Sequence, residues 1–289
     1  MKCFDCPVKC GADRALGLGA CKAPEQFVVA HADLHFWEEP CISGQTGTGA
    51  IFFGGCNLNC VYCQNSLISH TGRGQKVSFE QLKNLIFNLI EQKACSISFV
   101  TPSHYTTQLK EFLTELKPFL KVPVVYNSSG YDDVESLKKL NGLIDAYLPD
   151  FKYGDANLAK TYGAREDYPV VAQKAIRQMF VQQPVTEFDD DGIIKKGVIV
   201  RHLVLPNAIE NTKKVLKMLA NIDKNAYVSL MSQYFPAGRA ENFKDLSRKI
   251  TQEEYDQAIE YFFELGLENG FMQELSSATD SFVPKFNLL

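Results

Sequence analysis

Short apolar runs alternate with amphipathic segments from about residue 50 to the end of the chain. The apolar runs predict strands at residues 50–54, 96–100, 122–126, 143–148, 198–205 and 227–231. Between them, apolar residues recur at helical spacing, as in Leu82, Leu85, Ile86, Leu89 and Ile90. Strands that alternate with helices predict a parallel sheet with helices on its outside.

Local signals mark where several of these elements begin and end. Ser78 with Gln81, and Thr251 with Glu254, are typical of capping boxes that open a helix. Asn207 is expected to cap the helix after the fifth strand, with Glu210 three residues on. Residues 185–188 and the segment from residue 193 are predicted to form a hairpin that turns at Asp191-Gly192.

Size and charge narrow the class of protein. The 289 residues are 45% hydrophobic, which suffices for one domain of barrel size. The net charge of −4 argues against a nucleic-acid surface, and no apolar run approaches a membrane span. Met1-Lys2-Cys3 leads into cysteines without the apolar region of a secretory signal, so we expect a cytoplasmic protein. Residues 1–48 are expected to form a cysteine-rich extension, and residues 49–289 the barrel.

Cys56, Cys60 and Cys63 lie within eight residues in the spacing C-x3-C-x2-C. Thiolates this close can hold one soft metal centre, and cysteine thiolates hold four-iron clusters. Three ligands leave one metal open to substrate, as catalytic sites require. We therefore predict a [4Fe-4S] cluster with one free iron. The alternative is a zinc site that takes Cys41 as its fourth ligand, although zinc sites favour paired C-x2-C hooks.

This triplet, with Tyr62 before the last cysteine, resembles the radical S-adenosylmethionine (SAM) superfamily. The resemblance implies a partial (β/α)6 TIM-like barrel, open on one side, with Tyr62 near the adenine of SAM. It also implies that the free iron binds the amino and carboxylate groups of SAM. A flavodoxin or ferredoxin-like reductant would supply one electron, and SAM would break into methionine and a 5'-deoxyadenosyl radical. In barrels of this kind the chemistry lies at the carboxyl ends of the strands.

Two polar residues follow the second and third strands. Thr101 stands where related enzymes carry a Gly-Gly-Glu-Pro segment that receives the SAM amino group, and this chain departs from that pattern. Its hydroxyl and nearby carbonyls can still accept from an ammonium group. The alternative for Thr101 is a strand that simply ends at Pro102. Asn127 can bind a ribose or carboxylate, although Asn-Ser-Ser-Gly also favours a plain turn.

Charged residues follow the next two strands. Asp150 and Lys152 are two apart on an extended segment, so both side chains should share one face. They resemble the Asp-x-Lys motif of glycyl radical enzyme activating enzymes, which lies beside SAM. Arg201-His202 resembles a pattern from the same enzymes in which the histidine faces SAM. Strand alternation puts Arg201 and His202 on opposite faces. The alternatives are an ordinary ion pair and a core histidine.

Four further cysteines, Cys3, Cys6, Cys10 and Cys21, occupy the first 21 residues. Four thiols at this spacing can close around a structural zinc or a second iron–sulfur cluster. A second cluster could relay electrons to the first, whereas zinc could only brace the segment. The alternative is free or redox-active cysteines without metal.

Most of the chain resembles the homologues of pyruvate formate-lyase activating enzyme. They share the cysteine-rich front, the Glu-Glu-Pro-x-Ile-Ser-Gly segment at residues 38–44 and the cluster motif. The resemblance implies activation of a glycyl radical enzyme. One alternative is a radical SAM enzyme that modifies another protein or a small metabolite. Others, from different classes, are a non-catalytic iron–sulfur electron carrier and a zinc-binding interaction protein.

Overall fold

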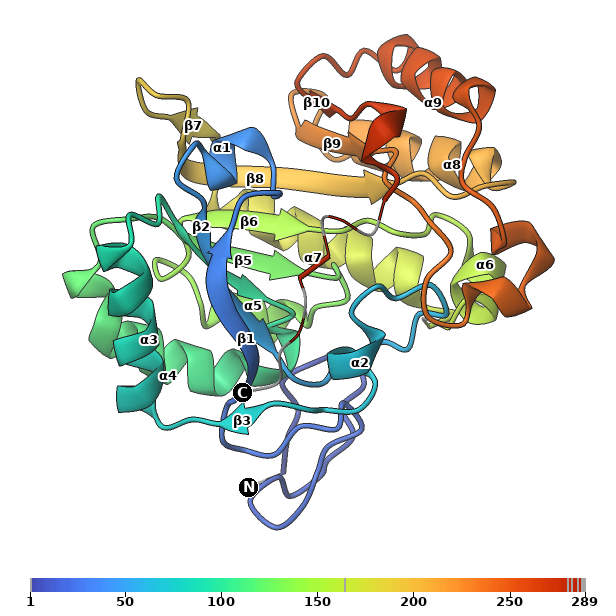
Figure 1. Ribbon diagram of the computed structural model, residues 1–289. Helices are drawn as coiled ribbons and strands as arrows, with labels where there is room; N and C mark the ends of the chain where they lie inside the picture. The colour runs from blue at the N-terminus through green and yellow to red at the C-terminus, as the bar shows by residue number, and fades with distance from the viewer. Residues whose placement is uncertain (1, 164, 280, 282, 285, 287–289) are drawn as a thin grey trace.

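The structure is a computed structural model, which describes residues 2–163, 165–279, 281, 283, 284 and 286. Its centre is a curved sheet with strand order β10-β9-β8-β6-β5-β4-β2-β1-β3, and β7 pairs with β8 (Figure 1). The parallel strands of the described sheet are β2 (Thr48–Phe53), β4 (Ile97–Val100), β5 (Val124–Ser128), β6 (Ala146–Pro149), β8 (Ile194–Leu203), β9 (Tyr227–Met231) and β10 (Gly270–Met272). The six predicted strands are confirmed, and β10 was not expected.

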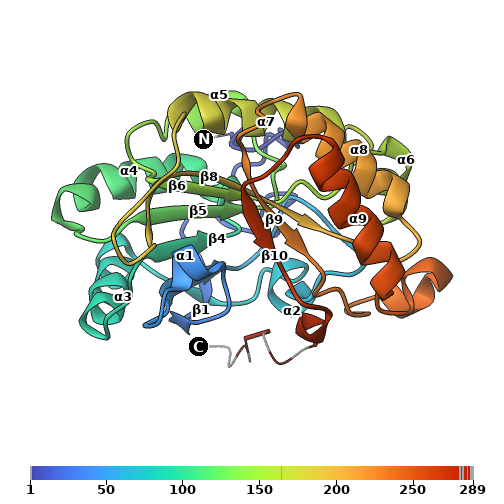
Figure 2. The same cartoon turned by 90° about the horizontal axis from the view of Figure 1, so that it is seen from above.

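Helices cover the outer face of this sheet. Seen from above, they form an arc around the strands while the other side stays open (Figure 2). The helices outside the sheet are α3 (Phe79–Glu91), α4 (Thr106–Leu116), α5 (Val134–Lys138), α6 (Ala156–Thr161), α7 (Tyr168–Gln182), α8 (Ile209–Ala220) and α9 (Gln252–Glu264). Short 3-10 turns lie at Ser103–Tyr105, Lys117–Phe119, Ala240–Asn242, Lys244–Leu246 and Leu275–Ser277. The fold is an unclosed barrel, as predicted.

The capping signals are correct at two helices and wrong at a third. Ser78 and Thr251 open α3 and α9 with complete capping boxes. At α8, however, the N-cap is Ala208 and no side chain caps the helix. Asn207 instead donates its side-chain amide to the Asp245 carbonyl, and Glu254 accepts from its backbone N–H. The hairpin of β7 (Glu187–Phe188) with β8 is confirmed.

Two elements before β2 and one short strand after it were not expected. β1 (Val28–His35) pairs antiparallel with β2, and β3 (Gln75–Lys76) pairs antiparallel with β1. Between β1 and β2 lies the short helix α1 (Pro40–Ser43), whose Cys41 and Ile42 pack among apolar side chains of β5, β6 and β8. Residues 28–43 thus belong to the same packed structure as the barrel strands. A division of the chain at residue 48 stays a prediction.

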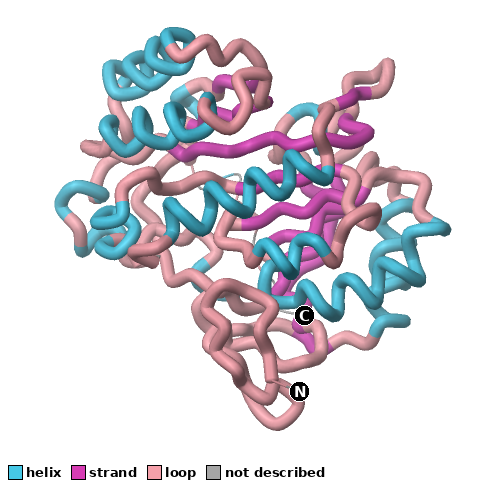
Figure 3. The backbone as a smooth tube through the Cα atoms, turned by 180° about the vertical axis from the view of Figure 1, so that it is seen from behind, coloured by secondary structure: helices cyan, strands magenta, loops and turns pink. Residues whose placement is uncertain are grey.

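Residues 2–27, which we call the N-terminal lobe, form loops at one end of the molecule (Figure 3). Their β pairing within the described part is an isolated bridge between Lys2 and Asp13. The lobe contacts the barrel through Arg14, which donates to the His104 carbonyl, and through Asp5, which accepts from Thr107. Among the described residues, no helix has the length and apolar character needed to cross a membrane.

Candidate active site

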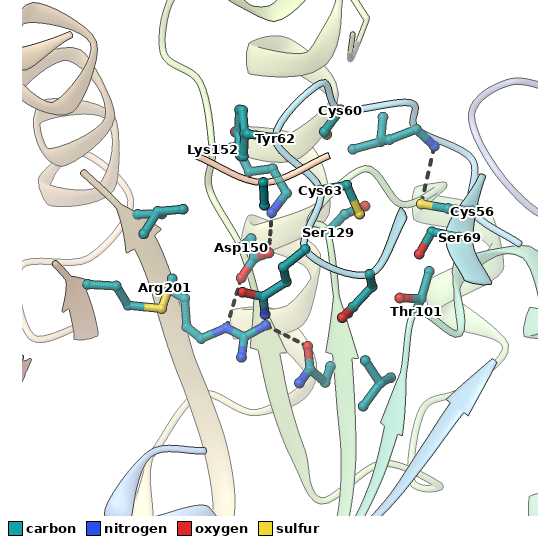
Figure 4. A pocket seen from close by; sticks show the side chains of 18 of the residues that line it. Cys56, Cys60, Tyr62, Cys63, Ser69, Thr101, Ser129, Asp150, Lys152 and Arg201 are labelled. Carbon is teal, nitrogen blue, oxygen red and sulfur yellow. Dashed lines mark hydrogen bonds and ion pairs between the residues drawn. The ribbon is translucent and has the colours of Figure 1, made fainter. Parts of the chain in front are cut away.

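A cavity of about 170 Å³ lies at the carboxyl ends of the parallel strands (Figure 4). Except for His202, the residues predicted to hold the cluster and SAM all line it: Cys56, Cys60, Tyr62, Cys63, Thr101, Asn127, Asp150 and Lys152. They come from the ends of β2, β4, β5 and β6 or from the loops that follow. Arg201 of β8 and Met231 of β9 line the same cavity. Side chains far apart in sequence therefore meet where barrel enzymes place their chemistry.

The cysteine loop follows β2 directly and curls over the cavity. Gly55 has φ +88°, and a Cβ there would lie 2.3 Å from the Cys21 carbonyl oxygen, so only glycine fits. Backbone amides point at two of the three sulfurs. The Leu58 N–H donates to Cys56 Sγ at 3.4 Å, and Asn65 donates to Cys63. Such donors favour thiolate over thiol, which suits metal ligands.

Burial opposes ionisation of these thiols, and a lysine counters it. Desolvation raises the pKa of Cys60 to about 12, while the positive charge of Lys152 acts in the lowering direction. Uncoordinated, the triplet would stay protonated at neutral pH. A bound metal displaces these protons, because thiolates are its ligands.

The spacing of the ligands distinguishes a cluster site from a single-ion site. Within the described residues, no three His, Cys, Asp or Glu side chains gather closely enough to hold a single metal ion. In a four-iron cluster each thiolate binds a different iron, so the ligands stand farther apart than around one zinc. Cys41, the fourth ligand of the zinc alternative, packs with Val125 and Ile194 and does not line the cavity.

Arg201 joins the charged side chains of the cavity floor into one network. Its Nε donates to Asp150 Oδ1 at 2.8 Å, and its Nη1 donates to Glu38 Oε2 at 2.9 Å. Its Nη2 donates to Asn127 Oδ1 at 2.6 Å, and Asn127 Nδ2 donates to Glu38 Oε1 at 2.8 Å. Glu38 thus reaches the floor of the site from the segment just before α1. From the sequence alone, Glu38 had no assigned role beyond its place in the segment of residues 38–44.

Asp150 and Lys152 are a charged pair. Burial alone would raise the pKa of Asp150, but Arg201 and Lys152 outweigh it and hold that pKa below its ordinary value. Burial would lower the pKa of Lys152, but Asp150 outweighs it and the pKa is raised. Both groups therefore carry charge at neutral pH, and Lys152 donates to Asp150 beside the cysteine loop. A ligand with both an ammonium and a carboxylate finds complementary charges there.

Thr101 lies in the left-handed region, with φ +61°. This conformation is a true outlier for a β-branched residue and persists only where neighbours enforce it. Its N–H donates to the Asn127 carbonyl at 2.9 Å, which ties the ends of β4 and β5 together. Thr101 lines the cavity at this strained turn.

His202 does not line the cavity, and Arg201 takes the position expected for it. The histidine is fully buried, with Nδ1 2.7 Å from the Phe151 carbonyl and Nε2 2.9 Å from Thr212 Oγ1. The carbonyl can only accept, so Nδ1 carries the proton and Nε2 accepts from the hydroxyl. Burial lowers the pKa of His202 to about 4. His202 is a neutral core residue behind the cavity wall.

Comparison with known protein families indicates which class of enzyme this site resembles. A family model described as the radical SAM superfamily matches residues 50–180, which contain the cysteine triplet, Thr101, Asn127, Asp150 and Lys152. This part of the chain is therefore similar to the radical SAM superfamily. The match implies a [4Fe-4S] cluster and SAM, for which the triplet and the charged floor supply suitable groups.

Individual proteins similar to this chain support the fold but do not identify the substrate. The chain is 28% identical over 267 residues to the uncharacterized protein MJ0674 of Methanocaldococcus jannaschii, covering 89% of this chain and 73% of that protein. Streptococcus suis SuiB bound to its precursor peptide SuiA is similar in structure, with a TM-score of 0.52 and 12% identity over 77% of this chain and 48% of SuiB. A domain of pyruvate-formate lyase-activating enzyme from Bacteroides vulgatus matches 60% of this chain and 91% of that domain at 14% identity and a TM-score of 0.40.

Proposed function

We propose that this chain cleaves SAM reductively and passes the resulting radical to a protein substrate. One observation carries the proposal: Cys56, Cys60 and Cys63 share one cavity with the Asp150–Lys152 pair. The three thiolates would hold a [4Fe-4S] cluster, which supplies the electron that breaks the sulfur–C5' bond of SAM. Methionine and a 5'-deoxyadenosyl radical result, and that radical removes a hydrogen atom from the substrate.

The protein's own side chains would bind and orient SAM. Asp150 offers a carboxylate to the ammonium group, while Lys152 and Arg201 offer donors to the carboxylate. The three contacts of Arg201 within the described residues use three of its five N–H donors, which leaves two for a ligand. Tyr62, held edge-on against Tyr153 and Tyr234, offers an aromatic surface for the adenine.

The reductant is proposed to approach a second hollow of about 490 Å³ beside the cysteine loop. Cys56 lines this hollow as well as the main cavity, so an electron entering there would have a short path. Lys22 and Arg165 also line the hollow, and the described residues that line it include no carboxylate. This charge favours an acidic carrier of the flavodoxin or ferredoxin type.

A glycyl radical enzyme is the substrate we propose, on the basis of the Asp150-x-Lys152 motif beside the cavity and the resemblance of the chain to activating enzymes. The strained Thr101 turn, which replaces the Gly-Gly-Glu-Pro segment, favours a second candidate. In that case the radical would act on a different protein or on a small metabolite.

The radical chemistry is tested anaerobically. The protein is reconstituted with iron and sulfide, reduced with dithionite and given SAM, and 5'-deoxyadenosine and methionine are measured. We expect both products from the wild type and from Cys95→Ala, whose thiol lies outside the cavity, but none from Cys60→Ala. A reduced, cluster-loaded wild type that neither binds nor cleaves SAM would instead identify an electron carrier. Tightly held zinc without iron would overturn the proposal.

The substrate is tested with pyruvate formate-lyase added to the same reaction. Electron paramagnetic resonance should then show a glycyl radical, which should be absent when Cys60→Ala replaces the wild type. Production of 5'-deoxyadenosine without any glycyl radical would support the second candidate.

A further inference from the structure

The N-terminal lobe buries little apolar surface of its own. Leu16 is 88% exposed, Leu18 58% and Phe4 53%. Small segments that lack a hydrophobic core are usually stabilised by disulfides or by a bound metal. The cysteines of the lobe are free thiols, and Cys6 and Cys21 are buried, Cys21 within the apolar core that the lobe shares with the barrel. A segment that buries thiols while its leucines stay exposed is suited to stabilisation by a bound metal.

Backbone amides converge on the sulfurs of the lobe. Val8 donates to Cys6 and Ala23 donates to Cys21, each from two residues further along the chain, and Cys10 accepts from Ala20 as well as from Ala12. Left-handed residues shape the turns, with φ values of 45° at Lys9, 63° at Gly11 and 66° at Lys22. The amide donors favour the thiolate, while burial raises the pKa of Cys6 to about 12 and that of Cys21 above its ordinary value, so a bound metal would have to displace the protons.

The same local geometry occurs in the cysteine loop of the barrel. There Leu58 donates to Cys56 and Asn65 donates to Cys63, again from two residues further along. The lobe therefore repeats, at three of its four cysteines, a feature found at two of the three cysteines that we assign to the cluster.

A buried cation lies among the lobe thiols. The Arg14 side chain is 3% exposed, and its Nη1 lies 3.6 Å from Cys3 Sγ. Its Nε donates to the Pro24 carbonyl at 2.9 Å, and its guanidinium stacks on Tyr105 at 4.7 Å. Asp5, 3.9 Å away, is a distant partner for so buried a charge. Thiolates on the nearby cysteines would balance Arg14 more completely.

The four thiols lie in one neighbourhood and contact the barrel loop. Cys3 interacts electrostatically with both Cys6 and Cys21, and Cys10 interacts with Cys21. The described side chains do not bring three ligands to single-ion spacing, so binding needs inward rotation of the side chains or a centre with several metals. The Cys21 carbonyl accepts from the Cys56 N–H at 3.1 Å, and Cys6 interacts with the Asn57 side chain.

We propose that Cys3, Cys6, Cys10 and Cys21 bind one thiolate-ligated metal centre, zinc or an iron–sulfur cluster, that holds the lobe against the loop carrying Cys56. Each thiol releases its proton to solvent as it binds. With zinc, four thiolates leave a charge of −2, which Arg14 partly offsets. The metal content of the lobe does not depend on the proposed radical function, so the two proposals can fail separately.

The experiment uses the full chain with Cys56, Cys60 and Cys63 all changed to serine. This variant lacks the ligands of the barrel cluster, so any metal that it binds is held at another site. Zinc, iron and sulfide are measured per chain after anaerobic purification. We expect about one zinc, or about two to four irons with matching sulfide. Adding Cys10→Ser and Cys21→Ser should lower that content at least tenfold. Adding Cys95→Ser instead should leave it unchanged, because that thiol lies far from the lobe in the fold.

Because buried Cys21→Ser could unfold the lobe, Cys10→Ser alone provides a milder variant, since Cys10 is exposed. The chelator 1,10-phenanthroline should lower the melting temperature of the triple-serine protein but not after Cys10→Ser is added. A triple-serine protein with less than about 0.1 zinc or iron per chain would overturn the proposal. Equal metal content with and without Cys10 and Cys21 would overturn it as well.

Discussion

Arg201 connects three side chains from separate parts of the chain: Glu38, Asn127 and Asp150. Replacing it with methionine keeps much of the volume but leaves Glu38, whose side chain is 7% exposed, without its cation. Removing one partner of a buried pair costs about 3–5 kcal/mol, because the other charge stays buried. We expect Arg201→Met to lose roughly 3 kcal/mol in urea unfolding.

The matched control is Arg177→Met, on the exposed face of α7, where the arginine makes one long contact to the Asn221 carbonyl. That change should stay within about 0.5 kcal/mol of the wild type. Equal losses in the two variants would mean that the network contributes nothing to stability.

Two buried histidines make stability depend on pH. Burial lowers the pKa of His202 to about 4 and that of His104 to about 3, against about 6.5 in the unfolded chain. The unfolded state therefore takes up protons first as the pH falls. The stability that each neutral histidine contributes is complete above pH 6.5 and is lost towards the folded pKa, by about 2 kcal/mol between pH 6.5 and 5.

The variant His202→Gln tests this, because an amide can still donate to Phe151 and accept from Thr212. Urea unfolding at several pH values should show a shallower loss of stability between pH 6.5 and 5 than in the wild type. Identical slopes would show that His202 is not buried in its neutral form.

The exchange of His202 for Arg201 shows a limit of sequence reasoning at this scale. Alternation along β8 correctly put the two on opposite faces. Which face turns inward depends on the register of β8 against its neighbour, and Asp150 bridges to Arg201 only in the folded sheet. Buried arginines require carboxylates, so the ion partners Asp150 and Glu38 were the available signal for choosing Arg201.

At the scale of elements, the capping boxes of α3 and α9 contribute locally. Ser78 accepts from the Gln81 N–H at 3.2 Å, and Thr251 accepts from the Glu254 N–H at 3.2 Å. We expect Ser78→Ala and Thr251→Ala each to lose about 1 kcal/mol in urea unfolding. Thr114→Ala, on the exposed face of α4, should lose nothing, because its hydroxyl only bonds back to the Lys110 carbonyl. A loss at Thr114 as large as at the caps would contradict this account.

Elements with strong local patterns were predictable, and elements made by tertiary pairing were not. The six predicted strands are apolar runs, so the local sequence alone indicates that they are buried strands. β1 carries His31, Asp33 and His35, and it is a strand because β2 pairs with it over its length. β10 has three residues and pairs along one side with β9. Asn207 has capping chemistry, but Asp245 and Arg248, distant in sequence, bind its side chain.

At the scale of the whole molecule, Gly55 sets how closely the lobe and the barrel approach. A Cβ there would lie 2.3 Å from the Cys21 carbonyl oxygen, whereas at Gly142, with a similar φ of +78°, nothing lies within 4 Å. Gly142→Ala should therefore cost only backbone strain, about 1–2 kcal/mol. Gly55→Ala adds a collision and should separate the lobe from the barrel.

Hydrogen exchange measured over residues 2–27 distinguishes these outcomes. Exchange should speed up throughout the lobe in Gly55→Ala and stay at wild-type rates in Gly142→Ala. If both variants leave exchange in the lobe unchanged, its contact with the cysteine loop is not what orders it.

The lobe's distant contacts also bear on how the protein is made. Its partners His104, Thr107 and Asp133 lie about a hundred residues downstream, where they bind Arg14, Asp5 and Lys9. Since domains emerge from the ribosome amino end first, the lobe is synthesised well before the surface that receives it exists. During that interval its thiols are open to oxidation and to whichever metal is at hand. The metal that fills the proposed lobe site can thus be selected during translation, before the barrel has folded.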